Sequence, residues 1–505
     1  MRLFTTDVYD LKALKKYLLM LIAFMGLSYL TKGYVFVLLP LLVFWSVSQK
    51  FLVDLLFWVM VLSFTGVSNH YLFPKTALTF VIARLLLFAI AGILMLRVAG
   101  RRAAQIVSPF VGIFIYIVWE AFISMQGFEP IVSYLKILLF VPIYLALYTV
   151  ANEVTASTRV NAKAVRSAIL AIVIFIVFGS LAVWPFPGIS QLMARTTDDM
   201  VRIAQMVAAG DSLFMGITNH SQALGPMLGV MLTLVFGDLL FSVKRFEPLY
   251  VATLVVGFFL MVKTSSRTAM GTLFAGMAMM VWLFNLTRST NARWKAKVMS
   301  GTFLLLLVGG VAVLFVPRIR DRAIGFALKH NANTAQVERG DLTFENVTSS
   351  RQGLVDVAMA NFKKKPLTGN GFQVSEEMQY QRRSGFLDYM SAPIEKGVWP
   401  TAILEEGGVP GLVFFAGFLI CCFCMLVKRH AYIGAGTLWV FTVVNLGEFS
   451  FFSMSYTGGF EWALVFAAVI LDGQRMKNVG LEVWDVPIEE VFEEVGEDEW
   501  YRRQA

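Results

Sequence analysis

The sequence predicts an all-α membrane protein: a polytopic helical bundle of about 12–14 spans with one large extracytoplasmic loop. Hydrophobic residues make up 57% and charged residues 15% of the 505 residues, whereas a typical soluble domain is about 25% charged. The mean hydropathy is +0.68. A soluble core cannot bury this much apolar surface, which excludes a soluble globular enzyme and a disordered chain. With only three cysteines, a disulfide framework is excluded as well.

Long apolar runs recur along the chain, and each is a candidate span because about 20 residues cross the hydrocarbon core. The N-terminal basic residues precede the first run without a small-residue cleavage site, which indicates an uncleaved first helix. The candidate runs are 17–30, 34–48, 51–68, 77–96, 107–125, 131–150, 167–186, 221–241, 249–265, 269–287, 299–316, 401–427, 431–447 and 455–471.

Lysine and arginine gather in every second loop, as Lys50, Arg97, Arg159 and Lys244 illustrate. The intervening short loops contain almost none. This pattern follows the positive-inside rule and predicts that both termini are cytoplasmic. It also explains the net charge of +9 without a nucleic-acid partner.

The runs and the polar segments between them divide the chain into four parts. Amphipathic helices are expected within the two longer outside segments, at 188–216 and at 351–362. The parts are N-terminal transmembrane helices over 1–316, an extracytoplasmic loop with short amphipathic helices over 317–400, C-terminal transmembrane helices over 401–471 and an acidic cytoplasmic tail over 472–505.

Charged residues inside the expected spans fall mainly in the outer half of the membrane. They are Arg84, Glu120, Lys136, Lys263 and Arg267. Such charges are costly and usually face a cavity, a pathway or one another. Two readings stay open: charge pairing between helices, for instance Arg84 with Glu120, or a cation-rich cavity that opens to the outside.

Three stretches on the expected outer side carry recognisable motifs. The first is Lys-Thr-Ser-Ser-Arg-Thr-Ala-Met-Gly at 263–271. The second begins Ser-Arg-Gln-Gly at 350–353 and ends Pro-Leu-Thr-Gly-Asn-Gly-Phe at 366–372. The third is Ile-Leu-Glu-Glu-Gly-Gly-Val-Pro-Gly-Leu at 403–412, and Gly-Ile-Thr-Asn-His-Ser-Gln at 216–222 is a weaker match. In order and spacing these stretches resemble the O-antigen ligase and polymerase family of bacterial polysaccharide assembly.

The resemblance implies an inner-membrane glycosyltransferase with a GT-C-like fold. Its donor would be a glycan on polyprenyl diphosphate, and its acceptor a second glycan. The other implied partners are membrane lipids and proteins of polysaccharide assembly, with no nucleic acid. No cofactor is implied, and the sequence has no ligand spacing for zinc.

Such a reaction needs a grip on the diphosphate, which leaves as a stable anion. The planar guanidinium of arginine suits this task because it bonds two phosphate oxygens at once. Arg267 and Arg351 are the first candidates, and Arg84 and Lys263 the second. The remaining cavity residues are Lys136, Glu120 and Lys396.

A base for the acceptor hydroxyl is expected at Glu395 or at His220. The family usually has a His-Asn pair shortly before its Glu-x-Gly, but here Glu395 and Lys396 stand at about that place. Polymerisation and ligation share donor chemistry, so both stay open. Two other classes also stay open: a transporter or flippase of lipid-linked oligosaccharides, and a sensor or scaffold.

Overall fold

In the computed structural model, the regular secondary structure of the described residues is helical, apart from two isolated β-bridges. The described residues are 8–74, 77–99, 103–157, 159–191, 200, 214–242, 247–264, 266–286, 344–375, 396–454 and 457–478. The helices, with two short 3-10 turns η1 and η2, are α1 (Leu11–Leu30), η1 (Tyr34–Val37), α2 (Leu39–Ser48), α3 (Leu52–Thr65), α4 (Ala77–Val98), η2 (Ser108–Gly112), α5 (Ile113–Ser124), α6 (Pro130–Ala156), α7 (Ala162–Val183), α8 (Pro187–Ser190), α10 (Ser221–Phe241), α11 (Pro248–Lys263), α12 (Arg267–Leu286), α15 (Phe344–Lys364), α17 (Trp399–Lys428), α18 (Tyr432–Val444) and α19 (Thr457–Asn478).

The predicted apolar runs coincide with these helices, except 299–316, which lies outside the described residues. Six helices in the described part of the chain are long and apolar enough to cross a membrane: α1, α6, α7, α10, α12 and α17. The shorter apolar helices include α3, α11 and α18. The prediction of an all-α, multi-pass membrane protein is therefore confirmed at this level.

Local sequence explains where several helices begin. Asp10 and Asn161 cap α1 and α7 by accepting hydrogen bonds from the backbone N–H groups of Lys12 and Lys163. Pro130 occupies the first turn of α6, where the missing N–H costs nothing. These starts fix the bundle helices at the ends of their apolar runs.

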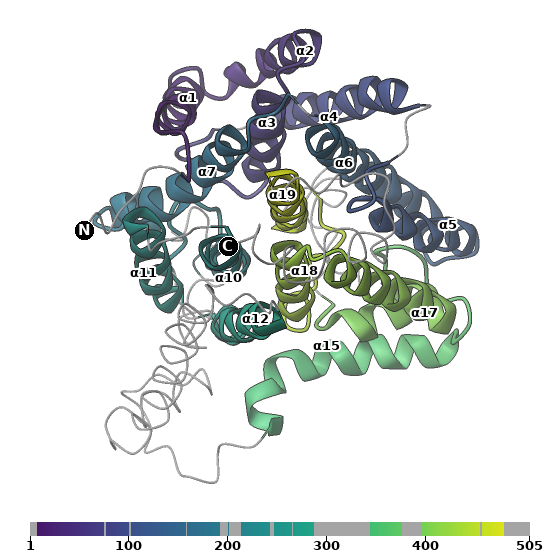
Figure 1. Ribbon diagram of the computed structural model, residues 1–505. Coiled ribbons are helices and arrows are strands. Elements are labelled where there is room, and N and C mark those ends of the chain that lie inside the picture. The colour runs from purple at the N-terminus through teal and green to yellow at the C-terminus, as the bar shows by residue number, and fades with distance from the viewer. Residues whose placement is uncertain are drawn as a thin grey trace, which may run out of the picture.

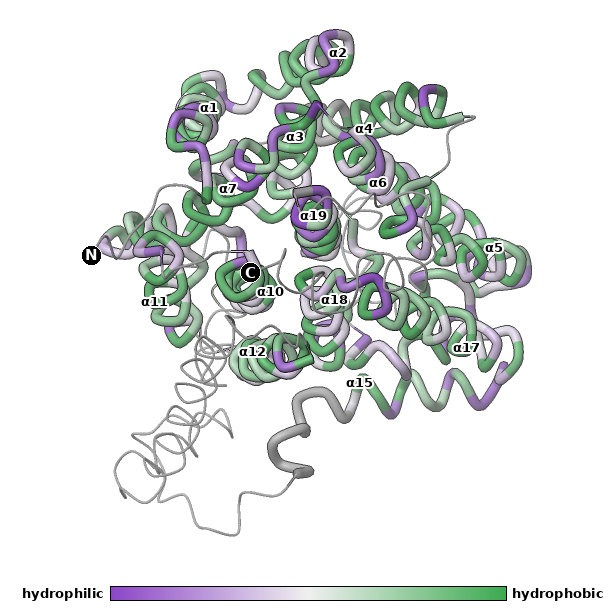
Figure 2. The backbone as a smooth tube through the Cα atoms, viewed as in Figure 1, coloured by the Kyte–Doolittle hydropathy of each residue, from purple (hydrophilic) through white to green (hydrophobic). Residues whose placement is uncertain are grey.

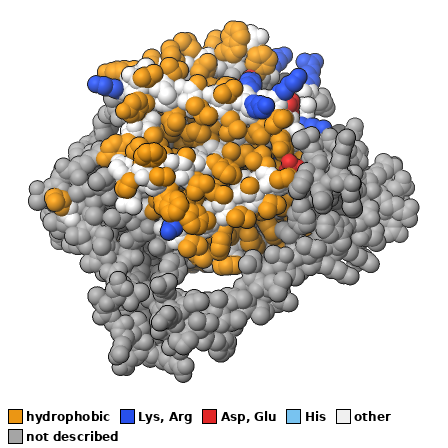
Figure 3. Space-filling view, turned by 90° about the vertical axis from the view of Figure 1, so that its left-hand side faces the viewer, with side chains coloured by type: hydrophobic (Ala, Val, Ile, Leu, Met, Phe, Trp, Pro, Cys, Tyr) orange, Lys and Arg blue, Asp and Glu red, His pale blue; other side chains and the backbone are white. Residues whose placement is uncertain are grey.

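Helix α19 forms the centre of the bundle and is buried along almost its whole length. It packs against α3, α6, α7, α10 and α18, which surround it in Figure 1. Figure 3 views the side on which α1 and α11 lie, and it shows a broad apolar belt with lysine and arginine mostly along the upper margin. Leu19 of α1 and Val255 of α11 are apolar residues that are 65% and 63% exposed. Such a belt fits contact with lipid tails.

The bundle has two polar ends, which we name by their residues. The basic end contains Lys50, Arg97 and Arg159, and the motif end contains Gly369 and Glu405. The assignment of the basic end to the cytoplasm stays a prediction.

Helix α15 differs from the others in its polarity. It runs along the outside of α17 at the lower edge of Figure 1, and Figure 2 shows more hydrophilic colour on it than on the bundle helices. The amphipathic helix expected at 351–362 is confirmed as part of α15, with Ala358 on its buried face. The amphipathic helix expected within 188–216 falls mostly on residues 192–199 and 201–213, which lie outside the described residues. Parts 317–343 and 376–395 of the long loop and the tail beyond 478 also lie outside them.

Candidate functional site

The second and third motif stretches join at the motif end. Backbone N–H groups of Asn370 and Gly371 donate to the carbonyls of Glu405 and Glu406, at 2.8 and 3.0 Å. In return, Val409 N–H donates to the carbonyl of Pro366 at 2.9 Å. We call this interlocked region, residues 366–375 with 396–411, the junction.

The junction depends on two glycines. Gly408 interrupts α17 with φ 65° and ψ −166°, a region essentially restricted to glycine. A Cβ there would lie 2.6 Å from the carbonyl carbon of Leu367. Gly369, with φ +63°, would place a Cβ 2.1 Å from the carbonyl oxygen of Glu406. One glycine of each motif, Gly369 and Gly408, is thus explained by a close approach of two backbone segments.

Lys396 supplies the central positive charge of the junction. Its Nζ lies 2.9 Å from Glu406 Oε1 and 3.2 Å from Glu405 Oε2. It also donates to the carbonyl of Val374 at 2.7 Å. The side chain is buried, which on its own would lower the pKa of this ammonium, but the carboxylates of Glu405 and Glu406 outweigh burial and raise the pKa of Lys396. It therefore remains charged.

Glu405 connects α15 to the junction. Its Oε1 accepts hydrogen bonds from Asn361 Nδ2 at 2.8 Å and from Ser375 Oγ at 2.7 Å. Asn361 belongs to the buried face of α15. One carboxylate therefore fixes the amphipathic helix, the loop after it and Lys396 together.

Glu120 and Lys136 complete the buried polar cluster, from α5 and α6. Lys136 Nζ donates to the carbonyl of Gln373 at 3.1 Å. Glu120 lies against α17, since a Cβ on Gly407 would approach its Oε1 to 2.3 Å. Trp119 Nε1 donates to the carbonyl of Gly407 at 2.8 Å. The structure thus brings together three of the predicted cavity residues: Glu120, Lys136 and Lys396.

Burying this many charges is expensive, and removal of one partner of a buried ion pair leaves an uncompensated charge. Both lysines here also bond backbone carbonyls of the same short segment, 373–374. These two hydrogen bonds hold that segment in place. Direct contact of Lys136 or Lys396 with a substrate stays a prediction.

The first motif stretch lies at the same end of the bundle. Ser266 packs against Gly225 of α10, where a Cβ would meet its Cβ at 2.6 Å. Thr268, in the first turn of α12, packs in the same way against Gly447. The turn after α18 then reaches α17, because Trp399 N–H donates to the carbonyl of Asn445 at 3.0 Å.

The two predicted arginines have defined backbone positions only. Arg267 is the first residue of α12, and Arg351 lies within α15. Their side chains, and all of Glu395, lie outside what the structure describes. Their assignments therefore stay predictions.

The junction contacts described above do not involve the other predicted residues, His220, Lys263 and Arg84. His220 caps α10, since its Nδ1 accepts a hydrogen bond from Gln222 N–H at 3.0 Å. The ammonium of Lys263 is exposed and lies 5.3 Å from the ring centre of Trp184. Arg84 is half-buried in α4, which packs against α6.

Asn361, Ser375 and Glu405 are cluster residues that no single motif identifies as polar contacts. The helical spacing of Leu354, Ala358 and Asn361 places the asparagine on the apolar face of its helix. A polar residue on such a face indicates a buried polar contact. Nothing in the sequence gives the pairing of Ser375 with Glu405, because it depends on the turn at 369–371.

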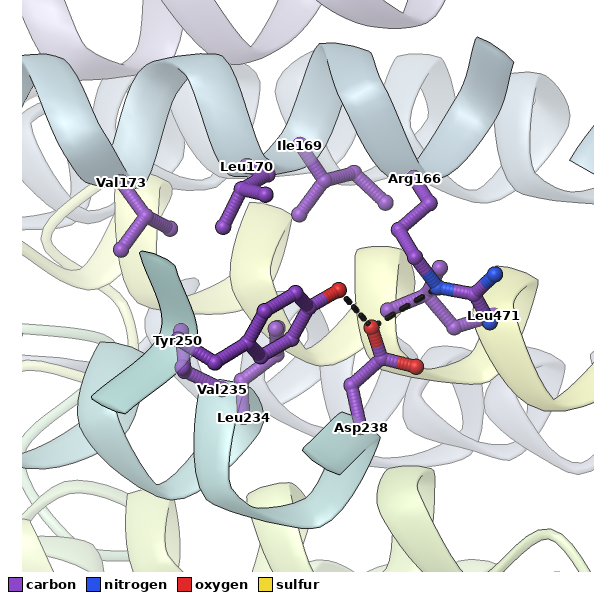
Figure 4. Close-up of a pocket in the computed structure, with 9 residues that line it drawn as sticks. All are labelled: Arg166, Ile169, Leu170, Val173, Leu234, Val235, Asp238, Tyr250 and Leu471. Carbon is purple, nitrogen blue, oxygen red and sulfur yellow. Dashed lines mark hydrogen bonds and ion pairs between the residues drawn. The ribbon is translucent and has the colours of Figure 1, made fainter. Parts of the chain in front are cut away.

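A second buried polar cluster lies at the basic end (Figure 4). Asp238 Oδ2 accepts from Tyr250 OH at 2.6 Å and from Arg166 Nε at 2.8 Å. The enclosed space is only about 10 Å³, enough for about one water molecule. This cluster therefore ties α7, α10 and α11 together rather than forming a binding site.

Among the described residues, no group of three histidine, cysteine, aspartate or glutamate side chains could hold a metal ion. No protein-family model and no curated protein matches this chain.

Proposed function

We propose that the chain is an inner-membrane glycosyltransferase of GT-C-like fold that polymerises or ligates glycan units from a polyprenyl-diphosphate-linked donor. The observation that carries this proposal is the junction, in which the two motif stretches 366–372 and 403–412 interlock around a buried charge cluster. A glycine-dependent junction that the turn after α18 connects to the start of α12 is suited to holding a substrate in fixed geometry.

In the proposed reaction, an acceptor hydroxyl oxygen attacks the anomeric carbon of the donor. The bond from that carbon to the diphosphate oxygen breaks, and its electron pair leaves with polyprenyl diphosphate. The hydroxyl proton passes to a base. Arg267 and Arg351 would stabilise the growing negative charge, since their planar forks match phosphate oxygens.

The junction would serve as the positioning element for this chemistry. It fixes α15, which carries Arg351, through the bond from Asn361 to Glu405. Lys396, engaged with two carboxylates, would keep this assembly closed rather than attract the donor itself.

Glu395 is the better candidate for the base. The Nδ1 lone pair of His220 is already used by Gln222 N–H, so a neutral His220 carries its proton on Nε2 and can only donate there. Glu395 directly precedes Lys396, and its carboxylate would need no change of tautomer.

The alternative is a transporter or flippase of lipid-linked oligosaccharides. The break in α17 at Gly408 favours it, because transporters use interrupted helices next to buried charges. Glycan transfer and lipid movement are separable activities, so one experiment can distinguish them.

The test uses the purified full chain with a polyprenyl-diphosphate oligosaccharide and an acceptor glycan. We expect release of polyprenyl diphosphate together with a lengthened glycan, and a loss of about 100-fold or more in Arg267→Ala, as when an oxyanion-type contact is removed. Arg267→Lys should lose most activity as well, because the bidentate contact disappears. Movement of the lipid across liposomes without transfer would refute the enzyme and support the transporter.

A further inference from the structure

The basic end holds a cavity that is separate from the junction, and α6 is the helix that contributes residues to both. This cavity has a volume of about 850 Å³ and lies among the ends of α1, α2, α3, α4, α6 and α7. These helices pack side by side in the upper part of Figure 1. Its size is within the range of about 300–1,000 Å³ typical of small-molecule sites.

The cavity is lined by cations from three different segments: Lys50, Arg97 and Arg159. Two carboxylates, those of Asp54 and Glu153, also line the cavity. Asp54 is paired with Lys16 at 2.7 Å and accepts from Tyr17 OH at 2.6 Å, while Glu153 is largely buried. Counting Lys16, positive groups therefore outnumber negative ones around the cavity.

The cavity also has an apolar wall, to which Phe51, Leu52 and Val160 contribute. Phe51 is 47% exposed. A site that combines cations with an apolar wall, at the ends of membrane helices, matches the boundary between lipid headgroups and acyl chains. Basic pockets in such a position bind anionic lipid headgroups.

The backbone at Lys50 determines which substitution can test the cavity. Lys50 lies two residues after the end of α2 and has φ 58°, in the left-handed region that glycine favours. Phe51 N–H donates to the carbonyl of Ser46, and Lys50 N–H to that of Val47. This is a Schellman cap, in which glycine is the usual residue. A lysine therefore occupies a position where glycine would be more stable, and its side chain lines the cavity.

We propose that this cavity binds the phosphate headgroup of an anionic glycerophospholipid, with Lys50, Arg97 and Arg159 as its cationic contacts. The acyl chains would pass over the wall formed by Phe51 and Val160. Arg97 is held in place because its Nη1 donates to the carbonyl of Val47 at 2.9 Å. This site is separate from the proposed reaction at the motif end.

The chain offers a matched pair of variants. Lys50→Gly removes a cavity charge but keeps, or relaxes, the backbone. Lys32→Gly makes the same substitution at the end of α1, where Lys32 has φ 50° and the same capping bonds. Lys32 does not line the cavity. Both variants should therefore fold, and only one should affect the lipid.

The purified full chain in neutral detergent would be titrated with phosphatidylglycerol, and the thermal unfolding midpoint measured. We expect the lipid to raise the midpoint, with about fivefold weaker apparent affinity for each cation removed in Lys50→Gly and Lys50→Gly/Arg159→Gln. Lys32→Gly should behave as wild type. Equal weakening by Lys32→Gly would overturn the site.

The source of the phosphate is tested with glycerol 3-phosphate and with inorganic phosphate. We expect neither to shift the midpoint at concentrations where phosphatidylglycerol does. If either one shifts it equally, and Lys50→Gly abolishes that shift, the ligand is a soluble anion and the lipid assignment is wrong. Phosphatidylcholine, which has no net charge, should have no effect in any variant.

Discussion

Gly408→Ala is the sharpest test of the junction because the structure shows which backbone conformation and which contacts the substitution would disturb. The backbone at Gly408 lies in a region that costs about 1–3 kcal/mol for other residues. The new Cβ would also lie 2.6 Å from the carbonyl carbon of Leu367, and backbone atoms cannot move aside cheaply. Relief requires the loop to withdraw, which would break the bonds from Val409 to Pro366 and from Gly371 to Glu406, at about 1 kcal/mol each. We expect a total loss of about 3–5 kcal/mol.

Gly417→Ala in the same helix is the control, because nothing lies within 4 Å of its Cβ position. Alanine should stabilise a helix interior there by about 0.5–1 kcal/mol. The assay is the apparent unfolding midpoint of the purified chain in one detergent, followed by tryptophan fluorescence. We expect a clear decrease for Gly408→Ala and no decrease for Gly417→Ala. If Gly408→Ala is as stable as Gly417→Ala, the interlocked junction is wrong.

Three further predictions concern charged and titratable groups, and each is read from the same unfolding midpoint. Lys396→Met should destabilise the chain by about 3–5 kcal/mol, and adding Glu406→Gln should restore part of the loss; no recovery would argue against their ion pair. His220→Ala should lower the free energy of unfolding by about 1 kcal/mol because the N-cap hydrogen bond is lost, whereas His220→Asn should retain that bond. Equal losses in the two variants would contradict the role of His220 as N-cap. Burial, followed by the charge of Arg475, lowers the pKa of His430 to about 4. Neutral His430 should therefore contribute to the free energy of unfolding above pH 6.5, and this contribution should be lost as the pH falls toward 4. If the unfolding midpoint of His430→Gln falls by the same amount over this pH range, the assignment to His430 is wrong.

Much of the fold could be predicted because apolar runs of the right length leave a membrane helix few alternatives. The sequence also predicts that α15 is amphipathic, since Leu354 and Ala358 recur at helical spacing. It does not predict that α17 is interrupted, because Gly407, Gly408 and Pro410 could equally sit in a loop before a shorter helix. That interruption depends on the loop at 366–371, which lies far away along the chain.

The same reasoning applies to the candidate site. In-span charges could be identified as special because burying them is costly, and two of them, Glu120 and Lys136, lie in one cluster with Lys396, which the sequence places at the end of the long loop. Their partners could not be predicted, since Glu405 and the carbonyls of Gln373 and Val374 become neighbours only through tertiary contacts. The structure places Glu120 against Gly407, and a pair of Arg84 with Glu120 stays a prediction.

The location of substrate is the central claim, and a photoreactive polyprenyl-diphosphate oligosaccharide tests it directly. The probe would be irradiated with the purified full chain and the labelled peptides mapped. We predict adducts in 264–270, 350–375 and 396–411, which unlabelled lipid-linked donor removes by competition. Adducts confined to α1–α4 at the basic end, or labelling that the donor does not reduce, would contradict the account.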